Sequence, residues 1–146
     1  MADAVGLARS EVVDATTRFG WLVDRGHWEE LERLFSPQVE VDYTSLDGGE
    51  PYWGPIRPKL DEWREHWERA DAMQHLLSSQ LVTLPSPGFA VCTANYVATV
   101  VSSNTAKRSI WNMGGTYRFE LIHDVGAWKI SRILMQVLWQ TGRRPS

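Results

Sequence analysis

One histidine lies in a sequence context that favours chemistry. His75 interrupts the segment DAMQHLLSSQLVTL (residues 71–84), whose alternating, mainly apolar pattern predicts a partly buried strand. An imidazole held there can act as a general base if a carboxylate orients the ring and balances the charge that the ring acquires. A purely structural histidine is the alternative. The other histidines, His27, His66 and His123, are interpreted as surface residues.

Asp24 is the carboxylate that could meet this requirement. It lies near the end of the first predicted helix, beside an apolar stripe that includes Thr16 and Phe19. The C-terminal end of a helix disfavours negative charge, so an acid there needs a compensating partner. A protonated imidazole would serve, and the pair would fix the histidine tautomer as in a Ser-His-Asp triad without its nucleophile. We predict a His75–Asp24 contact of roughly 2.6–3.2 Å at the floor of an apolar cavity. A solvated acid at a helix end is the alternative.

Tyr43 is the third residue with a predicted catalytic role. It shares one face of a predicted strand with Val39 and Val41, so its hydroxyl is expected to point toward the enclosed side. There it could polarise a carbonyl group or assist a leaving group. A structural tyrosine is the alternative.

The predicted substrate-binding residues come from later segments and from one loop. They are Trp53, Trp111, Asn112, Met113, Tyr117 and Arg132. Three of them alternate on one face of a strand, and Trp53 lies in a loop expected to cap the cavity. Arg132 could pair with an anionic intermediate or with Asp24. The aromatic residues could equally form core rather than cavity wall. The same alternation turns Glu120 outward, so the late strands offer no interior acid.

Hydrophobic periodicity predicts the elements that position these residues. Helices are predicted over 4–25, 27–35 and 57–69, and strands over 38–43, 73–84, 89–102, 107–122 and 127–139. The segment SLDGGEPYWGPIRP predicts a loop or a short hairpin, and PSPG, SSNTAK and HDVGA predict hairpin connections. The result is an α+β fold, a cone-shaped barrel of three N-terminal helices packed on a curved, mostly antiparallel sheet. Residues 1–140 form one domain, followed by a flexible tail over 141–146.

Composition and charge argue against several classes of protein. With 146 residues, the chain is the size of one domain. A net charge of −3 and no basic cluster before the GRRPS tail argue against a nucleic-acid surface. No apolar run approaches the roughly 20 residues that cross a bilayer, and no signal peptide is recognisable. The single Cys92 favours a reducing, cytoplasmic compartment. No metal or cofactor motif is found, so neither is expected.

The last predicted strand indicates an oligomer. At a period of two residues, four apolar side chains of this strand fall on the face of the sheet opposite to Ile130. They are Ile133, Met135, Val137 and Trp139. A sheet that is apolar on both faces needs a second cover, which predicts a homodimer or a higher homo-oligomer.

Three segments resemble one known family. FGWLVDRGHWEELERLFSPQVEVDYTSL, MQHLLSS and GGTYRFELIHDVGAWKISR are similar to segments of the SnoaL-like, nuclear transport factor 2-like superfamily. The resemblance covers about residues 5–140, and the nearest branch contains scytalone dehydratase, bile acid dehydratases and hexachlorocyclohexane dehydrochlorinase. It implies an Asp–His dyad at Asp24 and His75, which removes a carbon-bound proton during an elimination, and an active-site tyrosine at Tyr43.

The chain also departs from that branch. Pocket positions that are Ser and Asn in scytalone dehydratase correspond to Gly115 and Tyr117, and strand 89–102 lacks a second active-site histidine. Scytalone is therefore not expected as the substrate. The function predicted is a cofactor-independent lyase or isomerase acting on a small apolar or polycyclic molecule. A natural-product cyclase and a non-catalytic binder of small ligands are the alternatives.

Overall fold

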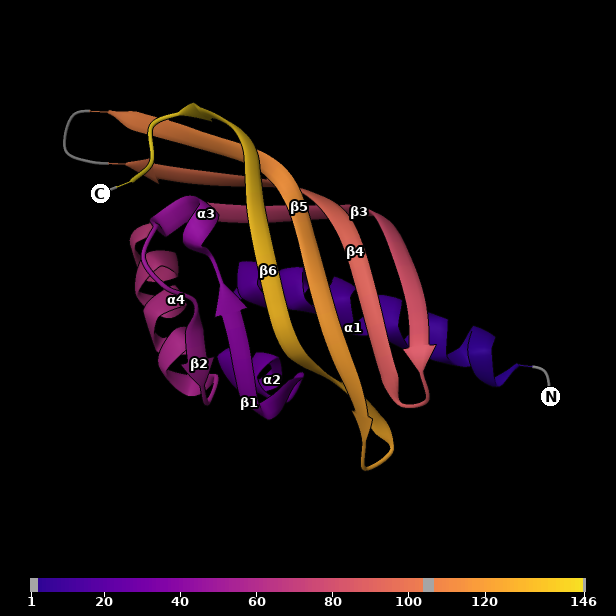
Figure 1. The fold of residues 1–146 in the computed structure, drawn as a ribbon. Coiled ribbons are helices and arrows are strands. Elements are labelled where there is room, and N and C mark those ends of the chain that lie inside the picture. Colours follow the sequence, from indigo (N-terminus) through magenta and orange to yellow (C-terminus); the bar gives the residue numbers. More distant parts are fainter. Residues whose placement is uncertain (1–2, 104–106, 146) are drawn as a thin grey trace.

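A curved six-stranded sheet with helices on one face gives the chain an α+β fold (Figure 1). The structure is a computed structural model and describes residues 3–103 and 107–145. The strands are β1 (Phe35–Asp42), β2 (Tyr52–Gly54), β3 (Ala72–Ser86), β4 (Phe89–Ser103), β5 (Arg108–Asp124) and β6 (Ala127–Gly142). Their order across the sheet is β2-β1-β6-β5-β4-β3. β1 and β6 pair in parallel and the other neighbours are antiparallel, so the predicted fold class is confirmed.

The long helix α1 (Ala4–Arg25) crosses the concave face of the sheet and packs mainly against β3. It buries Val12, Ala15, Thr16, Phe19, Leu22 and Val23, at the three- and four-residue spacing that predicted it. Val5, near the start of the helix, is exposed because the first turns of α1 extend past the sheet (Figure 1). The helix ends at Gly26, whose φ of 66° is left-handed and whose N–H group bonds the carbonyls of Leu22 and Val23.

Phe19 lies at the centre of the core. Its ring makes edge contacts with Phe35, Trp63, Tyr117 and Phe119, at centroid distances of 5.5–6.3 Å. These four rings come from β1, α4 (Arg57–Arg69) and β5, so one side chain of α1 joins the helix layer to the sheet. Edge-to-face pairs of this kind add to the stabilisation gained from burying apolar area.

The segment between α1 and β3 is more finely divided than predicted. Helix α2 covers only Trp28–Glu32, because Phe35 already belongs to β1 and pairs with Ile130 of β6. The predicted loop contains the short helix α3 (Thr44–Asp47) and β2, which forms a hairpin with β1. Helix α4 (Arg57–Arg69) begins and ends where it was predicted. The chain therefore has four helices in its described part rather than three.

Two irregularities in β6 overturn the predicted faces of that strand. The pairing with β5 shifts register between Glu120 and Leu121, where Arg132 and Ile130 are the partners, so Ser131 is an extra residue. Ile133 and Met135 are consequently fully buried, as is Ile130, and do not share the outer face. A second shift, between Gly114 and Gly115, makes Leu138 an extra residue.

The C-terminal segment contacts the rest of the fold. β6 continues to Gly142, two residues past the predicted boundary at 140, and Arg144 pairs with Asp47 of α3 at 2.7 Å. The centre of the predicted SSNTAK turn lies outside the described residues. Among the described residues, no helix combines the length and apolar character that spanning a membrane requires.

Candidate active site

His75 and Asp24 meet where the end of α1 packs on the start of β3. The His75 Nδ1 atom lies 2.6 Å from Oδ1 of Asp24, and the backbone N–H of His75 donates to Oδ2 of Asp24 at 2.7 Å. The two side chains are only 11% and 10% exposed. Because the carboxylate accepts hydrogen bonds, Nδ1 carries the ring proton in the neutral imidazole, and Nε2 presents a lone pair.

Two neighbouring contacts hold Asp24 in place. The left-handed turn at Gly26 ends the helix two residues later, and the backbone carbonyl of Asp24 accepts a hydrogen bond from Trp67 Nε1 of α4 at 3.1 Å. On the other side, His75 pairs with Ala98 of β4, so its position follows from the register of the sheet. The acid and the imidazole are thus fixed by separate elements.

A cavity of about 160 Å³ opens in front of the imidazole. Its interior is lined by apolar side chains from α1, α3, α4, β3, β4 and β5: Phe19, Val23, Leu46, Trp63, Ala70, Met73, Ala98, Val100, Trp111 and Met113. Two polar side chains, His75 and Tyr43, line the interior together with these apolar residues. Asp24 does not line this cavity and contacts it only through His75. The arrangement exposes one ring nitrogen to an apolar space and places the carboxylate behind it.

Tyr43 contributes a phenol that stays protonated. Its ring stacks on Trp63 at a centroid distance of 5.5 Å, and it lines the cavity. Burial raises the pKa of the Tyr43 phenol far above its usual value, and a hydrogen bond with Tyr117 opposes this shift in part. Burial also raises the pKa of Tyr117 well above its usual value. A neutral Tyr43 hydroxyl can donate a hydrogen bond to an oxygen that becomes negative in a reaction.

Of the predicted substrate-binding residues, Trp111 and Met113 line the cavity and the other four do not. Tyr117 lies behind the wall in the core, 2% exposed, against Phe19 and Tyr96. Trp53 does not cap the cavity. It lies in β2 at the edge of the sheet, opposite Glu40, and is 67% exposed.

Asn112 and Arg132 are on the outer face of the sheet, so neither of them lines the cavity. Asn112 alternates with Trp111 and Met113 and therefore points outward, where it accepts a hydrogen bond from Thr99 Oγ1 at 2.6 Å. Because Ser131 is an extra residue, Arg132 does not share a face of the sheet with Ile130.

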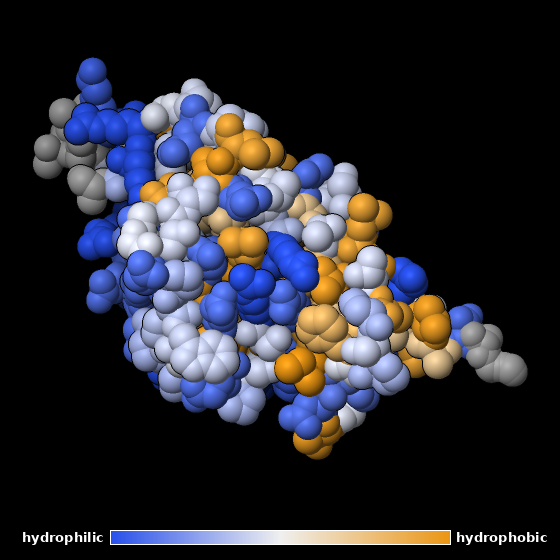
Figure 2. All heavy atoms as spheres, in the orientation of Figure 1, coloured by the Kyte–Doolittle hydropathy of each residue, from blue (hydrophilic) through white to orange (hydrophobic). Residues whose placement is uncertain are grey.

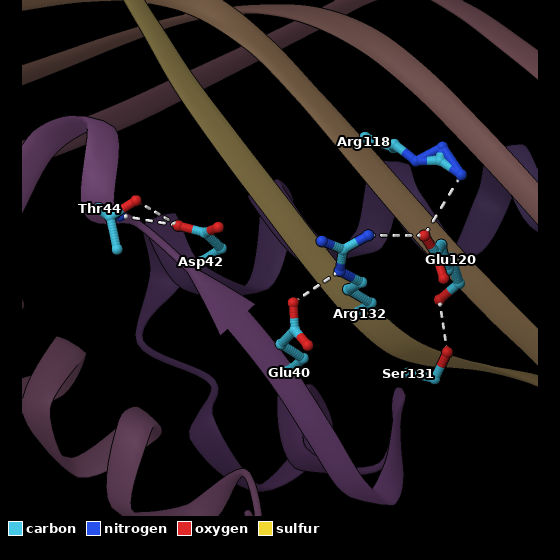
Figure 3. A network of polar contacts seen from close by, with 7 residues as sticks. All are labelled: Glu40, Asp42, Thr44, Arg118, Glu120, Ser131 and Arg132. Atoms are coloured by element: carbon cyan, nitrogen blue, oxygen red, sulfur yellow. Dashed lines mark hydrogen bonds and ion pairs between the residues drawn. The ribbon is translucent and has the colours of Figure 1, made fainter. Parts of the chain in front are cut away.

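Figure 3 shows the resulting surroundings of Arg132. Its guanidinium group donates to Glu40 at 2.8 Å and to Glu120 at 3.0 Å, and Arg118 also contacts Glu120. Arg132 is thereby neutralised far from Asp24. The outward direction predicted for Glu120 agrees with this network.

The rim of the cavity is formed by charged residues that the sequence analysis did not assign to the site. They are Asp47 of α3, Glu62, His66 and Arg69 of α4, and Arg144 of the C-terminal segment. His66 was interpreted as a plain surface residue; it is exposed, yet it lines the opening. Trp63, His66 and Ala70 are spaced by three and four residues, so the helical period would have placed them on one face.

The fold and the site together define a class of protein: a cone-shaped α+β domain with an Asp-supported histidine facing an apolar cavity. A model of the SnoaL-like domain matches residues 6–133, and the chain belongs to this family. A search of curated proteins found no match.

Several solved structures have the same fold. Kfla4162 from Kribbella flavida superposes with a TM-score of 0.85 at 19% identity, covering 91% of this chain and 92% of that one. A Novosphingobium aromaticivorans protein with the provisional name scytalone dehydratase superposes with a TM-score of 0.80 at 19% identity. The match covers 100% of this chain and 94% of that one. The hexachlorocyclohexane dehydrochlorinase LinA-type3 from Novosphingobium barchaimii superposes with a TM-score of 0.76 at 15% identity. The match covers 94% of this chain and 90% of that one. At these identities, the likeness concerns the fold.

Proposed function

We propose that the protein is a cofactor-independent lyase or isomerase that removes a carbon-bound proton from a small apolar molecule. One observation carries the proposal: an imidazole that lines an apolar cavity has its Nδ1 atom 2.6 Å from a carboxylate that is itself outside the cavity. This arrangement orients the other nitrogen of His75 toward a ligand and balances the charge of the imidazolium ion. Structural relatives named as a dehydratase and a dehydrochlorinase add support for an elimination.

The proposed step balances without a further reagent. Nε2 of His75 takes the proton from carbon, and the electron pair of that C–H bond forms the new double bond while the leaving group departs with its own bonding pair. Asp24 stabilises the imidazolium ion, and the Tyr43 hydroxyl donates to a carbonyl oxygen or to the leaving group. In an isomerisation, the imidazolium would return the proton to a second carbon instead.

The apolar lining also supports two other functions for the same cavity. A natural-product cyclase would use Trp63, Trp111 and Met113 to fold its substrate, with little demand on His75. A non-catalytic binder would use only the shape of the cavity. These alternatives differ from the lyase in what the dyad does, so variants of His75 and Asp24 separate them.

The test uses nitrobenzisoxazole as a probe. A base removes its ring C–H proton, the N–O bond breaks, and a coloured cyanophenolate forms without any cofactor. We expect the wild-type protein to accelerate this elimination and His75→Ala to lower the rate by about 10²–10⁴-fold. Asp24→Asn should lower it less, because the ring keeps a neighbour but loses the negative charge.

His27→Ala is the matched control. His27 lies at the start of α2, half exposed and outside the cavity, so its loss should leave the rate unchanged. If the probe binds but His75→Ala turns over as fast as wild type, the lyase proposal is wrong and the cyclase or binder is favoured. Circular dichroism of each variant shows that the fold is retained.

We also propose that the protein forms a homodimer through the outer face of the sheet. The cytoplasmic location predicted from the single cysteine stays a prediction.

A further inference from the structure

The two arginines at the rim of the cavity differ in their partners. The rim arginines are Arg69 and Arg144, and the rim acids are Asp47 and Glu62. Arg144 donates to Asp47 at 2.7 Å. Glu62 is paired outside the cavity, with Lys59 at 3.2 Å. Both acids of the rim are therefore occupied.

Arg69 has no carboxylate partner within residues 3–103 and 107–145. Its one polar contact there is with His66, whose Nδ1 atom lies 3.3 Å from Nη2 of Arg69. Because Arg69 can only donate, Nδ1 of His66 is the acceptor in this contact. The rim thus presents a guanidinium group beside an apolar cavity with most of its five N–H groups free.

On the basis of the proposed function, we infer that Arg69 binds an anionic group, a carboxylate, carried by the substrate. A planar guanidinium fork matches a carboxylate with two parallel hydrogen bonds. The apolar interior would hold the rest of the ligand, and an engineered cavity of about 150 Å³ is enough for one benzene ring. The substrate class is therefore a cyclic molecule that is apolar apart from one carboxylic acid group. Its ring enters the cavity of about 160 Å³ while the acid group stays at the rim.

A purely structural role for Arg69 is the competing explanation. Arg69 lies in the last turn of α4, where a cation favourably meets the negative end of the helix. That role would affect the stability of α4 but would not distinguish a charged ligand from a neutral ligand of the same shape. The test therefore compares two such ligands.

Benzoate and benzamide are the probes, because both place one ring and one planar group in the same shape and only benzoate is charged. Calorimetric titration should show that wild type binds benzoate about fivefold more tightly than benzamide. Arg69→Gln should remove this preference and leave the affinity for benzamide unchanged. Higher salt should weaken the preference in the wild type, since the rim is exposed.

Arg64→Gln is the matched control, because Arg64 belongs to the same helix, pairs with Glu68 and does not line the cavity. It should keep the full preference for benzoate. The inference is overturned if wild type shows no preference, if neither probe binds, or if Arg69→Gln keeps the preference while Arg144→Gln loses it. The titrations measure binding and not turnover. Failure of the elimination assay and failure of the carboxylate proposal can therefore be distinguished.

Discussion

Tyr96 carries a hydroxyl group that is buried without a hydrogen-bond partner among the described residues. The side chain is 2% exposed, and its ring packs on Tyr117 at a centroid distance of 4.6 Å. A buried hydroxyl that has left water without gaining a partner costs about 1–3 kcal/mol. We therefore expect Tyr96→Phe to raise the free energy of unfolding by about 1 kcal/mol in a denaturant titration.

Tyr117→Phe is the control for this change, because Tyr117 is equally buried but has a hydrogen bond with Tyr43 to lose. It should lower the free energy of unfolding by about 1 kcal/mol. A loss of stability in Tyr96→Phe would mean that its hydroxyl does have a partner in solution.

Alkaline pH gives a second measurement on the same variant. Burial raises the pKa of Tyr96 to about 12, whereas an unfolded tyrosine ionises near about 10. The stability linked to this group is therefore complete below about pH 10 and is lost as pH rises toward the folded value. Tyr96→Phe should lose stability less steeply with pH over this interval than wild type does.

At this scale, part of the site could be predicted from the sequence. The unfavourable position of an acid near the end of α1 and the family resemblance both pointed to Asp24 and His75. The rim was missed because a charged helix face usually means solvent, and sequence does not show that α4 borders an opening. Asn112 was misplaced although simple alternation with Trp111 already turned it outward.

The end of α1 is the element on which the position of Asp24 depends. Gly26 adopts a left-handed conformation, and a Cβ atom built on it would lie 2.6 Å from the ring of Trp67. Gly26→Ala should therefore combine backbone strain with a steric clash and lower the free energy of unfolding by about 2–4 kcal/mol. Because Trp67 also holds the carbonyl of Asp24, elimination of the probe should slow as well.

Gly88→Ala, in the turn between β3 and β4, separates the two causes. Gly88 also has a positive φ, 74°, but an added Cβ would meet nothing within 4 Å. It should cost only about 1 kcal/mol. Equal losses in the two variants would contradict the role assigned to Trp67.

The elements themselves followed from periodicity wherever one period persists. α1 and α4 were predicted well, because each has an apolar stripe and an evident start or stop. The faces of β6 were not predicted correctly, because simple alternation assumes that each residue pairs with one residue of the neighbouring strand. Ser131 is an extra residue in that pairing, and no glycine or proline in the sequence marks it. The parallel pairing of β1 with β6 joins residues nearly a hundred positions apart, which no local pattern encodes.

The outer face of the sheet is the feature of the whole molecule that remains uncovered. Figure 2 shows this face, with apolar side chains over β5 and β6 beside a central hydrophilic group. Ile110, Leu138 and Trp139 are 51%, 72% and 46% exposed. The Trp139 ring lies against Gly114, where a Cβ would approach it to 2.3 Å. Exposed apolar groups gathered on one face are typical of an interface.

Light scattering should therefore give twice the monomer mass at micromolar concentration, and Leu138→Glu should shift the protein to the monomer. Placing a charge in a buried interface without a partner is costly, whereas the same charge in solvent is not. Val125→Glu is the control, because Val125 is 96% exposed at the tip of the β5–β6 hairpin. A wild-type monomer would contradict the predicted dimer.

The carboxylate of Asp24 has two separate duties, one for each oxygen. Oδ1 serves the imidazole, whereas Oδ2 accepts the backbone N–H at position 75, a group that nearly every residue type would supply. Loss of the imidazole would therefore not release the acid, which would still anchor the start of β3 to α1. In a descendant without the proposed catalysis, selection on folding alone would keep Asp24 while His75 changed. An inherited acid at this position would thus record the architecture, and the histidine beside it would record the proposed chemistry.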